Sequence, residues 1–275
     1  MELTGKVVVV TGGASGIGRA LARRFADEGA RGVAVADIDA DGARAVADQI
    51  GADGGEATAA GCDVSDARQV EDLIAGAERA FGPVDMFCAN AGVGQGTGLD
   101  TPDDVWEQAF DVNVRAHVLA ARRLVPGWLE RGEGYFLSTA SAAGLLTQIG
   151  SAPYSVTKHA AVAFSEWLAV TFGRRGIRVS CLCPMGVNTN MLNAGLDMAD
   201  KEGVGARVVA AAGEVLEPED VAQAVVEGLR DERFLILPHP EVLEFFRRKG
   251  SDYDRWIAGM QRLQARIEGT EGAVT

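Results

Sequence analysis

Short apolar runs alternate with segments of helical periodicity along the first third of the chain. The run from Val7 to Val10 is β-branched and ends at a pair of glycines. The segment from Gly16 to Glu28 then carries Ile17, Leu21 and Phe25, each four positions after the last. A short β-branched run is typical of a strand, and an apolar residue at every fourth position indicates one buried face of a helix. The pattern therefore predicts a strand, a tight turn and a helix.

The same alternation continues beyond this first unit. It predicts further strands at Gly32–Ala36, Ala57–Cys62 and Val84–Ala89, and helices at Asp41–Ile50 and Ala67–Phe81. Strands that are apolar throughout and alternate with helices of this length indicate a parallel sheet with helices on both faces and right-handed crossovers. The expected fold class is doubly wound α/β, as in Rossmann folds.

The rest of the chain extends this pattern and adds two segments of another kind. We expect helices at Asp103–Leu124, Tyr154–Arg174 and Pro218–Leu229, and strands at Gly134–Ser138, Arg178–Cys183 and Phe234–Leu237. Residues 188–213 have weak periodicity and an apolar composition, which favours a lid over a substrate. Residues 241–267 carry apolar and aromatic side chains at helical intervals. We therefore predict one domain over residues 1–240 and a helical extension, 241–275, packed on the same domain or on a neighbouring subunit.

A glycine-rich turn follows the first strand. The sequence from Thr11 to Gly18 is TGGASGIG. Glycines in a strand-to-helix turn allow the backbone to bend sharply and to approach a pyrophosphate, which the helix N-terminus attracts. The turn predicts a dinucleotide site.

Asp37 indicates which dinucleotide is bound. It stands nineteen residues after Gly18, at the end of the second predicted strand. A carboxylate there accepts hydrogen bonds from the ribose hydroxyls of NAD and repels the 2′-phosphate of NADP. The nearby positions Ala14, Ser15 and Ile38 offer no positive charge for such a phosphate. We therefore predict NAD as the cofactor.

Charge and composition exclude several other classes of function. The formal net charge of −13 opposes binding to nucleic acid or anionic membranes. The four cysteines form no CxxC pair and the three histidines are scattered, so no metal site is predicted. No apolar run reaches the roughly 18 residues of a membrane span, and no secretory signal pattern precedes the first strand. We expect a cytoplasmic protein.

Six motifs in one order make the chain resemble the typical, short form of the short-chain dehydrogenase/reductase family. They are TGxxxGxG, an acidic residue after the second strand (Asp37), Asn90-Ala91-Gly92, Asn113, Ser141, and YxxxK at Tyr154 and Lys158. The resemblance spans Leu3 to Leu237. It implies an oxidoreductase that interconverts a secondary alcohol and a ketone.

The residues of the YxxxK motif suggest the chemistry directly. Tyr154 and Lys158 are four apart on a predicted helix, so their side chains share a face. A nearby ammonium favours the phenolate, and we expect Lys158 and the positive nicotinamide to lower the pKa of Tyr154 from its usual value of about 10. Tyr154 would then exchange a proton with the alcohol as general acid and base.

The resemblance implies the remaining roles. Ser141 would place its hydroxyl on the substrate oxygen, and Asn113 would distort its helix and hold a water that relays protons from the lysine. Pro184-Met185-Gly186-Val187-Asn188-Thr189 resembles the family's PGxVxT, with Met185 in place of a glycine, which leaves the backbone path there open. The implied cofactor contacts are Gly12, Ser15, Gly16, Ile17, Gly18, Asp37, Ile38, Asp63, Val64, Asn90, Ala91, Gly92, Tyr154, Lys158, Val187 and Thr189.

Two other functions fit part of the pattern. A 3-oxoacyl reductase acting on carrier-protein or coenzyme A thioesters would keep the same chemistry, although an acidic chain with Asp37 suits neither an acidic carrier nor NADP. A non-catalytic NAD sensor would keep the glycine turn, but it would not need Ser141, Tyr154 and Lys158 together.

The predicted helix from Tyr154 is apolar on nearly every side, which favours a homodimer or homotetramer over burial of that face beneath the C-terminal extension.

Overall fold

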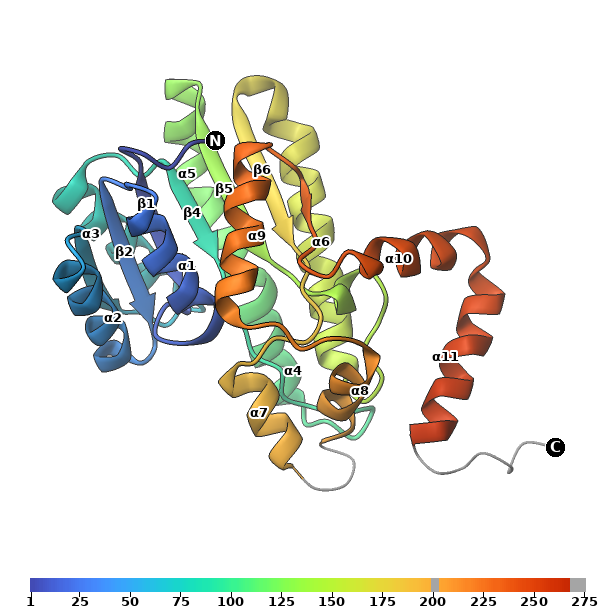
Figure 1. Ribbon diagram of the computed structural model, residues 1–275. Helices are drawn as coiled ribbons and strands as arrows, with labels where there is room; N and C mark the ends of the chain where they lie inside the picture. The colour runs from blue at the N-terminus through green and yellow to red at the C-terminus, as the bar shows by residue number, and fades with distance from the viewer. Residues whose placement is uncertain (199–202, 268–275) are drawn as a thin grey trace.

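A computed structural model of the protein describes residues 1–198 and 203–267 (Figure 1). Within these residues seven parallel strands form one sheet, in the order β3-β2-β1-β4-β5-β6-β7. The doubly wound α/β fold is confirmed. The strands are β1 (Val7–Thr11), β2 (Gly32–Asp37), β3 (Ala57–Gly61), β4 (Met86–Ala89), β5 (Gly134–Thr139), β6 (Ile177–Leu182) and β7 (Leu235–Ile236).

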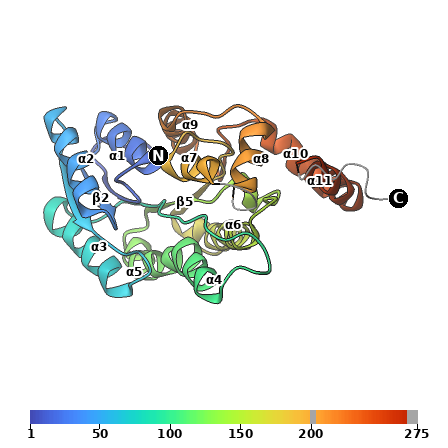
Figure 2. The same cartoon turned by 90° about the horizontal axis from the view of Figure 1, so that it is seen from below.

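Helices cover both faces of the sheet, and each face has its own apolar core (Figure 2). One core joins β1 and β2 to α1, α2 and α9, and it contains Leu21, Phe25 and Val225. The other joins the opposite face to α3, α5 and α6, and it contains Ile74 and Trp128. These helices are α1 (Gly16–Asp27), α2 (Ala40–Ala52), α3 (Ala67–Phe81), α5 (Ala116–Arg131), α6 (Ala152–Phe172) and α9 (Pro218–Arg230).

The strand order places a crevice beside β1 and β4. These strands are neighbours although β2 and β3 come between them in the chain, because the winding reverses direction after β3. At such a reversal the loops that leave the carboxyl ends of adjacent strands separate, and doubly wound folds bind ligands there. The glycine turn follows β1 and Asn90 follows β4, so both lie at this crevice.

The long helix predicted at Asp103–Leu124 differs from expectation. It consists of α4 (Asp103–Phe110), a π-helical turn η1 (Asp111–Arg115) and α5, which continues through Pro126 to Arg131. A proline normally ends a helix, but the following turn is held by Trp128, which is buried and donates its indole N–H to the Val84 carbonyl at 2.8 Å. Tertiary packing therefore overrides the local stop signal.

The predicted lid contains two short helices, α7 (Asn190–Asp197) and α8 (Val204–Ala212). Residues 199–202 of the expected lid lie outside the described residues. Two single 3₁₀ turns complete this half of the chain, η2 (Ala142–Gly144) after β5 and η3 (Gly173–Arg175) after α6.

The C-terminal extension forms two helices with different surroundings. Helix α10 (Glu241–Ser251) packs on the body through Val242, which is fully buried in a small core with Ala161 of α6. Helix α11 (Tyr253–Ile267) buries none of its described side chains, and it stands away from the body in both views (Figures 1 and 2). Residues 268–275 of the predicted extension lie outside the described residues.

Candidate active site

The glycine turn at the start of α1 has no room for side chains. Gly12 has a φ of +65°, and a Cβ atom there would lie 2.9 Å from the Cα of Ala91. A Cβ on Gly18 would lie 2.0 Å from the carbonyl oxygen of Gly12. Ser15 precedes α1 without bonding its side chain to the backbone N–H groups of the first turn, among the described residues. The Ser15 side chain therefore does not cap the first-turn N–H groups of α1, in which Ile17 is the second residue.

Asp37 is fixed in place by the same turn. Its carboxylate accepts hydrogen bonds from the backbone N–H of Ala14 and from that of Asp39, each at 3.0 Å. Ile38 is 79% exposed beside it. The carboxylate therefore stands at the carboxyl end of β2, at the rim of the crevice, with backbone donors that hold its orientation.

The residues expected beside the adenine follow β3. The Asp63 carboxylate accepts from both the backbone N–H and the hydroxyl of Ser65, at 2.9 and 2.6 Å. Val64 is buried against Ala91 and His117, at a small cavity beneath the crevice. The structure thus brings Val64 near the Asn90 segment, and the roles of Asp63 and Val64 toward a cofactor stay predictions.

Thr11 joins the first and fourth strands below the crevice. Its hydroxyl donates to the Cys88 carbonyl at 3.1 Å and accepts from the backbone N–H groups of Asn90 and Ala91. The Asn90 amide in turn donates to the Thr11 carbonyl at 3.0 Å. This role for the threonine of TGxxxGxG was not predicted. A hydroxyl at the end of a buried strand was the signal that could have indicated it.

The three predicted catalytic side chains converge at the carboxyl ends of β5 and β6. Pro153 and the N-terminus of α6 place Tyr154 one turn before Lys158, and the Lys158 ammonium lies 5.5 Å from the centre of the Tyr154 ring. Lys158 is 3% exposed and donates to the Thr139 carbonyl at 3.0 Å. Ser141 follows β5 and lies beside Tyr154, and its hydroxyl accepts from the Ala143 N–H at 3.1 Å.

The pKa values differ from those expected for the tyrosine. Burial raises the pKa of Tyr154 above its usual value of 10, and the neighbouring Ser141 hydroxyl lowers it by a smaller amount. Burial also lowers the pKa of Lys158 to about 8. The expected lowering of the tyrosine pKa is therefore not reached by this chain's side chains, because desolvation of the phenolate outweighs them. His117, beneath Lys158, is held neutral because burial, followed by the lysine charge, lowers its pKa to about 3.

Asn113 lies in the π-helical turn, so the expected helix distortion is confirmed. Its side chain is fully buried, and its amide accepts from the Val93 N–H at 2.9 Å and donates to the Val93 carbonyl at 3.0 Å. It also donates to the Thr157 hydroxyl at 3.0 Å. A Cβ on Gly92 would lie 3.2 Å from the Asn113 oxygen and 3.3 Å from the Lys158 nitrogen, so Asn113 and Lys158 meet beside the Asn90-Ala91-Gly92 segment.

Met185 follows an ordinary backbone path in place of the family glycine. Among the described non-glycine residues only Thr147 and Glu232 have positive φ. The Met185 N–H donates to the buried His239 ring at 3.1 Å, and the other ring nitrogen of His239 lies 3.2 Å from the Glu214 carbonyl. His239 thus anchors the segment that leads to the lid, a role that its position between two prolines did not reveal.

The end of this segment meets the glycine turn. Val187 is buried and pairs with Leu216. Thr189 caps α7 by accepting from the Leu192 N–H at 3.3 Å, and its methyl would lie 3.0 Å from a Cβ on Gly16. The predicted contacts after β6 therefore lie across the crevice from the start of α1.

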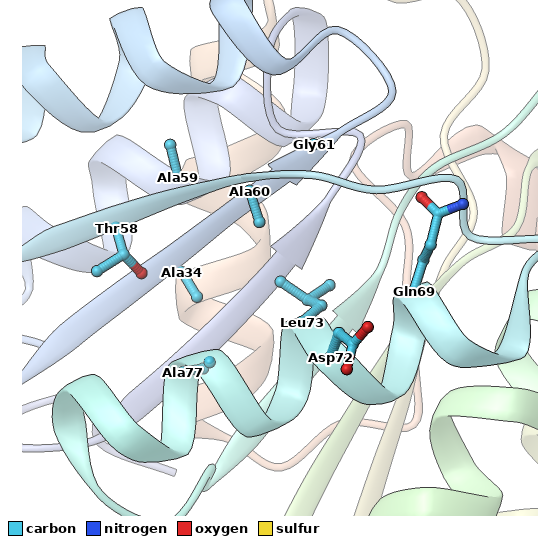
Figure 3. Close-up of a pocket in the computed structure, with 10 residues that line it drawn as sticks. Ala34, Thr58, Ala59, Ala60, Gly61, Gln69, Asp72, Leu73 and Ala77 are labelled. Atoms are coloured by element: carbon cyan, nitrogen blue, oxygen red, sulfur yellow. The ribbon is translucent and has the colours of Figure 1, made fainter.

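Other features of the described residues add no second site. A surface pocket lies at the edge of the sheet between β3 and α3, lined by residues such as Thr58, Gln69 and Leu73, and it contains none of the predicted site residues (Figure 3). Among the described residues, no group of three or more histidine, cysteine or acidic side chains is arranged to hold a metal ion. No helix in the described part of the chain is long and apolar enough to cross a membrane.

Comparison with known families agrees with this geometry. The sequence pattern of the short chain dehydrogenase family matches residues 6–200. The chain belongs to this family. A 1-deoxy-11-beta-hydroxypentalenate dehydrogenase from Streptomyces exfoliatus is 38% identical over 88% of this chain and 86% of its own. A 2,5-dichloro-2,5-cyclohexadiene-1,4-diol dehydrogenase from Sphingobium indicum is 36% identical over 84% of this chain and 92% of its own.

Solved structures of other short-chain dehydrogenases share the fold. One from Burkholderia phymatum, in complex with NAD, has a TM-score of 0.85 and 32% identity over 92% of this chain and 96% of its own. A 7α-hydroxysteroid dehydrogenase, complexed with NADH and 7-oxo glycochenodeoxycholic acid, has a TM-score of 0.77 and 27% identity over 86% of this chain and 93% of its own. This protein is therefore an oxidoreductase of the same family, in a group whose members act on hydroxyl and ketone groups.

Proposed function

We propose that this short-chain dehydrogenase interconverts a secondary alcohol and a ketone with NAD as its cofactor. The observation that carries the proposal is the convergence of Ser141, Tyr154 and Lys158 beside the Asn90-Ala91-Gly92 segment, which packs against the glycine turn. When bound, NAD⁺ supplies the acceptor for the hydride that leaves the alcohol carbon. The protein's own residues bind the alcohol, orient it and move its hydroxyl proton.

Tyr154 is the general base for the alcohol and the general acid for the ketone. Ser141 donates a hydrogen bond toward the reacting oxygen and stabilises its developing negative charge. Because burial raises the pKa of Tyr154, the phenolate needs positive charge nearby, which the Lys158 ammonium supplies from the next helical turn. Asn113 joins this group to the backbone at Val93 and, through a water, would connect Lys158 to solvent.

The preference for NAD rests on the rim of the crevice. The tight turn at Gly12 and Gly18 fits a pyrophosphate, because no Cβ atom at these positions keeps the phosphates away from the backbone. The oriented Asp37 carboxylate suits two ribose hydroxyls and repels a 2′-phosphate. The related structures hold NAD and NADH. We propose that the remaining contacts come from Ser15, Gly16, Ile17, Ile38, Asp63, Val64, Asn90, Ala91, Gly92, Val187 and Thr189.

The substrate class follows from the lid. Met191 of α7 approaches Tyr154, since a Cβ on Gly94 would touch the sulfur of Met191 at 3.4 Å and the Tyr154 ring at 3.9 Å. Met191, Leu196 and Met198 of the lid are each 39–47% exposed. Apolar side chains around one reactive hydroxyl suit a compact, apolar alcohol. The cyclohexadiene-diol and hydroxysteroid names of the relatives describe hydroxyls on rings, and we propose a cyclic secondary alcohol here.

The subunit arrangement extends this proposal. Trp167 is 54% exposed and Val170 is 84% exposed on α6, so the C-terminal helices leave this apolar face uncovered. We propose that a second copy of the chain covers it, which gives a dimer or a tetramer. We also propose that residues 1–240 form the catalytic domain and that residues 241–275 form an extension of it. Light scattering that returned a monomer mass would refute the association.

Reduction of NAD followed at 340 nm tests the function. The purified chain is given NAD or NADP with a panel of cyclic, aryl and steroid secondary alcohols and 3-hydroxyacyl thioesters. We expect NAD-dependent oxidation of a cyclic alcohol, with Tyr154→Phe slowed about 10²-fold or more. Tyr135→Phe is the matched control, because it removes another buried hydroxyl, bonded to Ser180 at 2.7 Å, away from the site.

Other outcomes favour the other functions. Turnover of thioesters alone, with NADP preferred, indicates a 3-oxoacyl reductase. Tight NADH binding without turnover of any substrate indicates a sensor. Full activity of Tyr154→Phe contradicts the assignment of the general base.

A further inference from the structure

The extension carries a buried lysine outside the predicted catalytic group. Lys249 of α10 is 6% exposed, and its ammonium donates to the carbonyl oxygens of Leu145 and Leu146 at 2.8 and 2.9 Å. Among the described residues, no ion pair involves Lys249, although most buried lysines are paired with acids. Backbone carbonyl dipoles therefore hold this charge in place.

Two aromatic rings of α11 complete the surroundings of this ammonium. Its nitrogen lies 4.9 Å from the centre of the Trp256 ring and 5.5 Å from that of Tyr253. Both distances are within the range of cation–π attraction, which is strongest for tryptophan and for a desolvated cation. Lys249 thus connects α11, which otherwise stands clear of the body, to the carbonyls that follow Ser141.

Those carbonyls belong to the segment that separates two predicted catalytic residues. Residues 145–151, which we name the clamped loop, lead from the Ser141 turn to Tyr154 on α6. Thr147 in this loop has a φ of +147°, a conformation that non-glycine residues adopt only when their surroundings hold it. Gln148 donates to the Gly205 carbonyl of the lid at 3.0 Å. The clamped loop is therefore held by the lid on one side and by Lys249 on the other.

A chain of hydrogen bonds links the lysine to the same loop through α6. Lys249 lies 3.4 Å from one ring nitrogen of His159, whose other nitrogen lies 2.8 Å from the Ser155 carbonyl. A carbonyl accepts, so His159 donates to Ser155 and accepts from Lys249. The Ser155 hydroxyl then accepts from the Gln148 N–H at 2.8 Å. His159 and Ser155 flank Tyr154 and Lys158 on the same helix.

We propose that Lys249 is a positioning residue through which the two C-terminal helices hold the clamped loop as a wall of the substrate pocket. The inference deepens the proposed function and rests on it for the identity of the pocket. The extension then sets the affinity for the alcohol, whereas Tyr154, Ser141 and the cofactor crevice set the chemistry. Loss of the ammonium should loosen the loop and weaken substrate binding.

Hydrogen exchange of the full chain tests the clamp without any substrate. Lys249→Met keeps the length of the side chain and removes its charge. We expect exchange in peptides covering residues 145–151 to accelerate about ten-fold, the effect of losing one hydrogen bond to a charged group. Arg248→Met is the matched control, because Arg248 is the exposed neighbour and, among the described residues, its side chain pairs only with Glu244 within α10. Equal exchange in the two variants would overturn the proposal.

Kinetics of the same variants test the consequence for the substrate. We expect Lys249→Met to raise the KM for the alcohol about ten-fold, with kcat and the Kd for NADH within about two-fold of wild type. If Lys249→Met folds poorly, Trp256→Leu replaces it as the test variant, because Trp256 stands on a helix without buried side chains. We expect it to change exchange and KM in the same direction as Lys249→Met. A fall in kcat at constant KM would overturn the positioning role. A wild-type chain without any turnover would refute the proposed function, while exchange would still decide the clamp.

Discussion

Replacing Lys158 by methionine should make the folded protein more stable while it removes the activity. Burial lowers the pKa of Lys158 from 10.5 to about 8, a difference of about 2.5. At about 1.4 kcal/mol for each pKa unit, the charged form costs the folded state roughly 3 kcal/mol. Methionine removes this cost and loses the hydrogen bond to the Thr139 carbonyl, about 1 kcal/mol. The expected gain at pH 7 is on the order of 2 kcal/mol.

The gain should depend on pH in a defined direction. Below pH 8 Lys158 is protonated in both the folded and the unfolded chain, so the cost is present in full. Between pH 8 and 10.5 the unfolded chain binds a proton that the folded chain does not, and this group makes the wild type more stable as pH rises. The advantage of Lys158→Met should therefore shrink across that window.

Urea unfolding at several pH values between 7 and 10 measures this difference. Lys6→Met is a matched control, since Lys6 pairs with Glu133 at the surface and should change the free energy of unfolding by less than about 1 kcal/mol. Oxidation of the alcohol by Lys158→Met should be slower by about 10²-fold or more. A variant that is less stable than wild type at pH 7, or an advantage that is constant from pH 7 to 10, would refute the reasoning.

Three further substitutions test other parts of the site. Asp37→Ala should reduce the preference for NAD over NADP, measured as the ratio of kcat/KM values, by about ten-fold or more, because a charged acceptor for ribose hydroxyls is lost; an unchanged ratio would contradict its role. Asn113→Ala should lower stability by about 1–3 kcal/mol in thermal unfolding and cut turnover while NADH binding persists, because the Val93 N–H and carbonyl lose their buried partner; wild-type turnover would dismiss the relay. His239→Phe should lower stability by a similar amount and weaken NADH binding several-fold in fluorescence titration, because the Met185 N–H is left unpaired; unchanged binding would separate this anchor from the crevice.

Local patterns predicted the layered architecture because the inner strands of the sheet are buried on both faces. Runs such as Val7–Thr11 and Gly32–Asp37 must then be apolar throughout, which is visible without any tertiary information. The convergence of Ser141, Tyr154 and Lys158 could also be predicted, since the motif spacing and the family resemblance carry it. The lid helices could not, because α7 has no buried side chain and so no strong periodicity.

Long-range contacts explain what the sequence did not reveal. The π-helical turn carries Asn113, whose side chain hydrogen-bonds to Val93, twenty residues away. Nothing in the local sequence distinguishes Lys249 from an exposed helix residue, and its burial becomes visible only through its contact with Leu145, 104 residues away. The side chains alone do not produce the expected fall in the pKa of Tyr154, a prediction that also included the positive nicotinamide. Spacing indicates the neighbouring cation, but the degree of burial, which raises the pKa, depends on the whole fold.

The isolation of α11 separates folding stability from substrate specificity, two properties that mutations in an enzyme usually change together. Helix α11 buries no described side chain, and Tyr253 and Trp256 meet the body at the Lys249 ammonium. The described part of α11 contributes no residue to the three apolar cores, so mutations along it should accumulate at little cost to folding. Variants of the protein that differ in this helix alone would differ in the substrates they accept, while the catalytic residues stay the same. Natural homologues could diverge in specificity through the same helix.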